Sequence, residues 1–151
     1  MGSGGGPGLA RTAFVAYAVA LAVVLLNPSA DLGGNAVTLV SDAAEWAGLP
    51  SWATDWDHVE VALNIVMLAP LPILGMVAWP ETGWVAWTAS FFVISMLAEG
   101  AQALLFSLRT GALVDVVANT TGACLGALSV AIWRRGSARR GRAAPATDPP
   151  S

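Results

Sequence analysis

Residues 99–126 read EGAQALLFSLRTGALVDVVANTTGACLG and set the architecture of the chain. Two apolar runs flank a short polar connection, residues 107–111, with Arg109 near its centre. An apolar run, a tight connection and a second apolar run are typical of two membrane helices that fold back on each other. The sequence therefore predicts an antiparallel helical hairpin that turns at Arg109.

Polar residues recur at matched distances on both sides of Arg109. Glu99 lies ten residues before it and Asn119 ten residues after it, so at about 1.5 Å of rise per residue they lie level in the hairpin. Gln102 lies seven residues before it and Asp115 six after it, which gives a second layer. Spacings of three and four residues also keep each helix's pair on one face. Such matching indicates that these polar groups bind a ligand or balance one another inside the hairpin.

The composition is that of a membrane protein. Of the 151 residues, 56% are hydrophobic and only 11% are charged, whereas a soluble domain carries about 25% charged residues. The chain has one cysteine and one histidine, so an intrachain disulfide and a metal centre of several cysteines or histidines are excluded. We expect no cofactor.

Four apolar segments are long enough to span a membrane: residues 12–30, 61–79, 84–106 and 112–133. Pro70 and Pro72 interrupt the second segment and predict a kink or a local break. The first segment has a competing interpretation as a signal peptide, because Arg11 precedes a short apolar core. Pro28 at the −3 position is a poor cleavage pattern, so a retained helix is favoured.

The acidic segment between the first two spans, residues 27–58, predicts a short helix along the membrane surface. Apolar residues recur there at helical spacing, as at Val37, Val40 and Ala44. An ordinary surface loop is the alternative. In a surface helix, three tryptophans would lie at headgroup depth: Trp46, Trp52 and Trp56.

The arginines predict the orientation. Arg11 precedes the first span, and five of the seven basic residues follow the last span within residues 134–142. The positive-inside rule then favours an even number of spans with both termini cytoplasmic. We expect a disordered lead (residues 1–10), a four-helix membrane domain (11–134) and a disordered basic tail (135–151). The basic run is explained by its role in setting the membrane topology and by contacts with anionic lipid headgroups. It therefore implies no nucleic-acid partner.

This orientation places six candidate ligand-binding residues in the outer half of the bundle or at its mouth: Asn64, Glu99, Gln102, Arg109, Asp115 and Asn119. Glu99 is the strongest functional candidate, because an ionised carboxylate in the hydrocarbon costs at least about 2.5–3.5 kcal/mol. A protonated Glu99 that only bonds Asn119 is the structural alternative. Arg109 could clamp a phosphate or carboxylate, or pair with Asp115. Gly122 and Gly126 predict close approach of a neighbouring helix.

The chain resembles the VanZ-like family of small bacterial membrane proteins over residues 57–133. The residues that carry the resemblance are Asp57, Asn64, Pro70-Leu71, Glu99-x-x-Gln102, Arg109, Asp115, Asn119-Thr120, Gly122-Ala123 and Gly126. The family's usual Phe-x-Pro-Leu-Gly appears here as Leu68-Ala69-Pro70-Leu71-Pro72, a departure that concerns the shape of the second helix. The resemblance implies a multi-pass protein of the bacterial cell membrane. The name-giving member is associated with low-level resistance to teicoplanin, a glycopeptide antibiotic that carries an acyl chain.

The leading hypothesis is a non-enzymatic membrane protein whose outward-facing polar pocket binds an envelope lipid or lipoglycopeptide and contributes to teicoplanin-type antibiotic resistance. One alternative is a membrane-embedded enzyme acting on a lipid-linked cell-wall precursor, with Glu99 or Asp115 as general acid or base. The lack of an evident nucleophile or metal set weakens that alternative. The other is a small transporter or flippase subunit, which would require a homo-oligomer.

Overall fold

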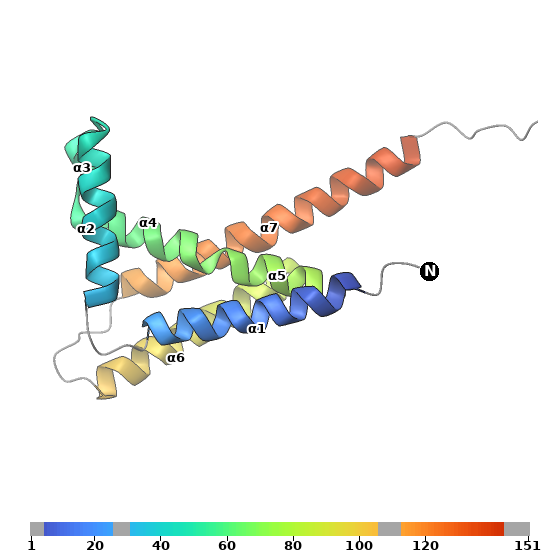
Figure 1. Ribbon diagram of the computed structural model, residues 1–151. Helices are drawn as coiled ribbons and strands as arrows, with labels where there is room; N and C mark the ends of the chain where they lie inside the picture. Colours follow the sequence, from blue (N-terminus) through green and yellow to red (C-terminus); the bar gives the residue numbers. More distant parts are fainter. Residues whose placement is uncertain (1–4, 26–30, 106–112, 144–151) are drawn as a thin grey trace, which may run out of the picture.

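The computed structural model describes residues 5–25, 31–105 and 113–143, and this part of the chain is all-helical (Figure 1). The helices in chain order are α1 (Gly5–Leu25), α2 (Asp31–Trp46), α3 (Ser51–Thr54), α4 (Trp56–Leu68), α5 (Pro70–Ala78), α6 (Trp84–Leu105) and α7 (Leu113–Ala143). Four stretches are long and apolar enough to cross a membrane, namely Gly6–Val24, Trp56–Ala78, Trp84–Ala101 and Leu113–Arg142. The predicted all-α bundle of four spans is confirmed.

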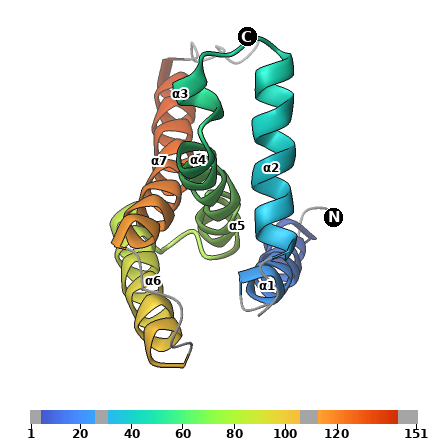
Figure 2. The ribbon, with the colours of Figure 1, turned by 90° about the vertical axis from the view of Figure 1, so that its left-hand side faces the viewer.

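The spans lie lengthwise beside one another, and α2 lies across one end of them (Figure 1). Figure 2 looks onto that end, where α2 runs from α1 past the start of α4. We call it the outer end, following the predicted orientation. The helix α1 begins, and α7 leaves the bundle, at the opposite or inner end (Figure 1). Placement of the inner end in the cytoplasm stays a prediction.

The second span breaks at its prolines, as predicted. Ala69 separates α4 from α5 and keeps helical dihedral angles, φ −58° and ψ −38°. Pro70 and Pro72 carry no N–H, so the backbone loses two donors at this point. The hydroxyl of Tyr17 on α1 donates to the carbonyl oxygen of Met67 just before the break, at 2.9 Å. The first span therefore packs against the weak point of the second.

The core joins all four spans. Its main cluster takes one or two buried residues from each span: Leu21, Leu68, Leu71, Phe91 and Ala123. A second cluster joins α5 to α7 through Met76, Ala127 and Val130. Lipid tails are as apolar as these side chains, so the hydrophobic effect does not drive the helices together. Van der Waals packing holds them in contact.

The helices extend further than the sequence predicted at both ends. The helix α1 begins at Gly5, and α7 continues through Ala143, so residues 5–10 and 135–143 are helical where we expected disorder. Residues 135–143 are mostly arginine and alanine, which favour helix, and the next proline is Pro145. The predicted basic tail is therefore, up to Ala143, a helical continuation of the fourth span.

The helix predicted between the first two spans is present as α2, and its place along the membrane surface stays a prediction. It ends in a Schellman motif, in which the N–H of Gly48 donates to Glu45 (2.9 Å) and that of Leu49 donates to Ala44 (3.0 Å). Gly48 adopts a φ of 76°, which glycine reaches without the steric cost that a Cβ brings. The chain turns there toward α3 and α4.

Candidate ligand-binding site

Two of the six predicted residues meet between α4 and α7. The amide nitrogen Nδ2 of Asn64 donates to Oδ1 of Asp115 at 3.2 Å, and both side chains are half-buried. Asp115 lies in the first turn of α7, where the helix dipole stabilises a negative charge. This contact joins the second and fourth spans through two residues that are 51 positions apart in the chain. It fixes the direction in which the carboxylate points.

Two glycines explain why α7 comes so close to α4. A Cβ added at Gly122 would overlap the carbonyl oxygen of Ile65, and one added at Gly126 would overlap that of Ala69. The predicted close approach is confirmed, and its partner is α4. Because the contacts advance by four residues on both helices, α4 and α7 run in the same direction. The same face of α7 carries Asp115.

Asn119 lies on this face of α7, one turn after Asp115. Its Oδ1 atom is buried and has no hydrogen-bond partner in the part of the chain that the structure describes. The hydroxyl oxygen of the neighbouring Thr120 is in the same state. An unsatisfied buried acceptor costs about 1–3 kcal/mol. The Oδ1 atom of Asn119 therefore leaves hydrogen-bonding capacity open one turn from the Asn64–Asp115 pair, whereas Thr120 lies on another side of α7.

The remaining predicted residues belong to α6 and to the connection after it. Glu99 lies on α6 and is half-buried. The backbone of Gln102 belongs to α6, but its side chain and the whole of Arg109 lie outside the described residues. The predicted levels, Glu99 with Asn119 and Gln102 with Asp115, stay predictions.

Sequence reasoning missed an apolar groove of about 390 Å³ between α6 and α7. On an α-helix of 3.6 residues per turn, its lining residues on α7 lie roughly opposite the face of Asp115 and Gly122. The hydroxyls of Thr88 and Thr121 donate to carbonyls of their own helices, at 3.0 and 2.7 Å, so they do not make the walls polar. The lining residues are Thr88, Phe92, Val116, Val117, Thr120, Thr121, Cys124 and Leu125. No charged residue is among them to mark the groove in the sequence.

At the inner end, two arginines donate to carbonyls at the end of the second span and just after it. Arg134 of α7 donates to the carbonyl oxygens of Pro80, at 3.1 Å, and of Met76. Arg11 of α1 donates from Nε to that of Ala78 at 3.3 Å, and its guanidinium lies 5.6 Å from the Trp79 ring centroid. Carbonyls at a helix C-terminus lack intrahelical donors and carry partial negative charge. The arginines thus tie α1, α5 and α7 together.

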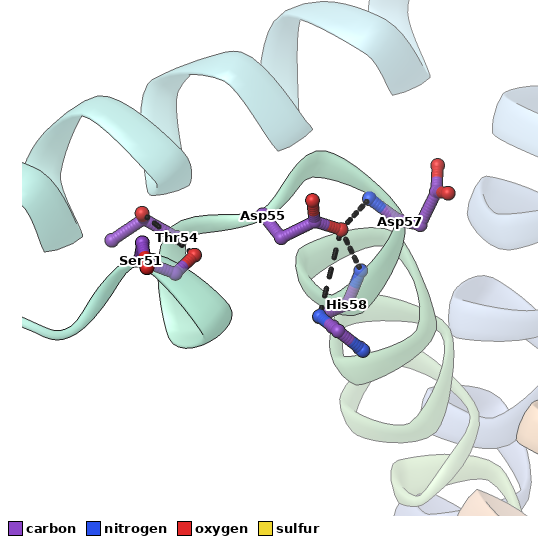
Figure 3. A network of polar contacts seen from close by, with 5 residues as sticks. All are labelled: Ser51, Thr54, Asp55, Asp57 and His58. Atoms are coloured by element: carbon purple, nitrogen blue, oxygen red, sulfur yellow. Dashed lines mark hydrogen bonds and ion pairs between the residues drawn. The ribbon is translucent and has the colours of Figure 1, made fainter.

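The outer end of α4 begins with a capped turn (Figure 3). The carboxylate of Asp55 accepts hydrogen bonds from the backbone N–H groups of Asp57 and His58, at 3.2 and 3.4 Å. Nδ1 of His58 lies 3.5 Å from the same carboxylate, and both side chains are exposed. This N-cap fixes the start of the helix that carries Asn64.

Four membrane-length helices, with polar side chains between the second and fourth spans, define a multi-pass membrane protein. The sequence model of the family described as VanZ/LLP1 matches residues 14–134. The match reaches all four described spans and covers most of the chain, so the chain belongs to the VanZ/LLP1 family. No curated protein and no solved structure is significantly similar to it.

Proposed function

We propose that the outer half of the bundle binds an amphiphilic component of the bacterial cell envelope, a lipid or a lipoglycopeptide, and so contributes to teicoplanin-type resistance. One observation carries the proposal. The Oδ1 atom of Asn119 is buried without a hydrogen-bond partner among the described residues, and it lies one turn from the Asn64–Asp115 pair. A buried acceptor without a partner needs an explanation, and a ligand bound beside Asp115 would supply one for Asn119.

The chemistry of these groups selects the kind of ligand. Asn119 offers a carbonyl acceptor, and Asp115 offers its carboxylate, held in place by Asn64. Both favour ligand groups that donate hydrogen bonds, such as hydroxyl, amide and ammonium groups. Sugar and peptide headgroups are rich in these donors. Since the site lies in a membrane-spanning region, the ligand would also need an apolar part that tolerates lipid tails.

The other predicted residues extend the proposed site toward α6 and the outer mouth. Glu99 adds a second carboxylate, Gln102 a further amide, and Arg109 a cation that suits a phosphate or carboxylate of the ligand. An amphiphile with donors at one point and an acid at another would use both sets. This is the chemistry of lipid-linked envelope components and of lipoglycopeptides.

Antibiotic susceptibility tests the proposal. A sensitive bacterium would express wild-type protein, Glu99→Gln, Asn119→Ala or Arg109→Ala at equal membrane abundance. We expect wild type to protect against a lipoglycopeptide, and the three variants to protect less. Two matched controls carry the same chemical changes at exposed positions, Glu81→Gln and Asn35→Ala, and should protect like wild type.

A glycopeptide without an acyl chain completes the design. Because the proposed ligand is amphiphilic, wild type should give no protection against this glycopeptide. Equal protection by wild type and by all three site variants would contradict the proposal. Turnover of a labelled lipid-linked precursor by purified protein would instead support the enzyme alternative.

A further inference from the structure

The helix α2 uses only a narrow strip of its surface to pack against the bundle. Val37 is 3% exposed and Ser41 is 9% exposed. Gly34 and Ala44 are half-buried and lie on the same side, since all four positions fall within one sector at 100° per residue. More than half of the helix circumference therefore faces the surroundings.

That free surface divides into a polar sector and an apolar sector. The polar sector lies on one side of the packed strip and contains the exposed residues Asn35, Thr38, Asp42 and Glu45. The apolar sector lies on the other side and contains three large exposed side chains: Leu39 (71% exposed), Val40 (40%) and Trp46 (92%). An exposed apolar sector of this kind needs a partner of its own.

The position of α2 determines which partner it meets. The four spans set the direction of the membrane normal, and α2 lies across them at the outer end (Figure 1). Its axis therefore runs roughly in the plane of the membrane. The helix is tethered at both ends, since only residues 26–30 separate it from α1 and α3 leads directly into α4. These short connections keep it next to the ends of the first and second spans.

We propose that α2 is an interfacial helix, whose apolar sector inserts into the outer leaflet while its acidic sector faces water. A helix in the membrane plane with separate polar and apolar sectors is the form that lies at the boundary of headgroups and acyl chains. Trp46 and the 70%-exposed Trp52 of α3 supply the aromatic anchors typical of that depth. In this arrangement, the lipid that contacts the apolar sector of α2 belongs to the same leaflet that surrounds the outer halves of the spans.

Fluorescence quenching at single sites tests this inference. Cys124 is the chain's one cysteine, so Cys124→Ser gives a background in which single cysteines take an environment-sensitive dye. Two variants probe the apolar sector, Leu39→Cys and Trp46→Cys, and two probe the acidic sector, Asp42→Cys and Glu45→Cys. Each protein is placed as a single copy in a phosphatidylcholine nanodisc.

We expect dyes in the apolar sector to be quenched several-fold more by lipid-attached nitroxide than dyes in the acidic sector. Aqueous iodide should show the reverse order. Equal iodide quenching at all four sites would overturn the inference, because the apolar sector would then face water. If the apolar-sector dyes were protected from iodide only when a disc held two copies of the protein, the inference would also be overturned. That result would indicate a contact between copies.

Circular dichroism of each labelled variant confirms that the fold is kept. Where a variant does not fold, Val40→Cys replaces the apolar probe and Thr38→Cys replaces the acidic-sector probe, with the same expected order.

Discussion

The two ends of the bundle differ in how their backbone and side-chain polar groups are paired. At the inner end, the carbonyls of Met76, Ala78 and Pro80 each accept from an arginine, Arg11 or Arg134. In the outer half, Asn64 and Asp115 bond each other, but Asn119 Oδ1 has no partner among the described residues. The arginines thus close the end of the second span, although Nε1 of Trp87 near that end is buried without a hydrogen-bond partner among the described residues. In the outer half, the open acceptor of Asn119 lies one turn from the carboxylate of Asp115, where the proposed ligand would bind.

The packing shows the same contrast. Near the inner end, aromatic rings fill the space between α1, α5 and α6: Phe14 meets Trp79 and Trp87 edge-on, with centroids 5.4 and 5.6 Å apart. Trp87 lies against Gly75, where an added Cβ would overlap its indole ring. Between α4 and α7, backbone packs on backbone at two glycines. Aromatic side chains pack the region between α1, α5 and α6, whereas main-chain atoms of α4 and α7 pack directly on each other.

The largest effect is expected from Gly126→Leu in the α4–α7 contact. The new side chain would collide with the carbonyl of Ala69, and backbone cannot yield as a side-chain tip does. Overpacking of this kind costs about 1–3 kcal/mol or more. We expect a lower unfolding temperature, or loss of folded protein, in detergent.

The matched control is Gly100→Ala, a helical glycine with open space around it. It should unfold at the wild-type temperature or slightly above, since alanine favours helix by about 1 kcal/mol over glycine. If Gly126→Leu were as stable as Gly100→Ala, the close contact between α4 and α7 would be refuted.

A smaller loss is expected from Arg134→Ala at the inner end. This change removes the donors for the carbonyls of Met76 and Pro80. Hydrogen bonds from a charged donor contribute about 1.5–3 kcal/mol, so thermal unfolding in detergent should occur several degrees lower. Arg135→Ala removes the same charge from an exposed position and should change the unfolding temperature little. Equal destabilisation by both variants would assign the effect to net charge.

The smallest effect is expected for the Asn64–Asp115 pair. A double-mutant cycle with Asn64→Ala and Asp115→Ala measures its coupling free energy. Hydrogen bonds between membrane helices average about 0.6 kcal/mol, with a maximum near 1.7 kcal/mol, so we expect a value in this range from equilibrium unfolding. Perfect additivity of the two variants would show that the side chains act independently.

The spans, the break and the glycine contact could be predicted from the sequence because each depends on local chemistry. Long apolar runs with at most one charged residue each define the spans. The missing N–H groups of Pro70 and Pro72 define the break, and the spacing of Gly122 and Gly126 predicts a close approach. The helical residues 135–143 could not be predicted in this way. Their charge indicated disorder, whereas continuation from a stable membrane helix removes the cost of starting a new one.

Partners across the bundle were harder to predict than the elements themselves. From the hairpin we expected Asp115 to lie level with Gln102 and considered Arg109 as its ion-pair partner. The contact that the structure describes is instead with Asn64 of α4. That pairing follows from how α7 packs on α4, which hairpin geometry does not contain. The arginine contacts at the inner end were missed because their acceptors are backbone carbonyls, which no residue type reveals. The groove between α6 and α7 has no polar residue pattern to signal it.

Ligand-induced stabilisation measures the central claim most directly. A ligand that binds only the folded state stabilises it by about 2.7 kcal/mol at a hundred times its dissociation constant. Thermal unfolding of purified protein in nanodiscs, with and without a lipoglycopeptide, should show this shift for wild type. Asn119→Ala should match wild type without ligand, since it breaks no described hydrogen bond of Oδ1, and should gain clearly less from ligand. Equal ligand-induced shifts in wild type and Asn119→Ala, or no shift in wild type, would contradict the proposed site.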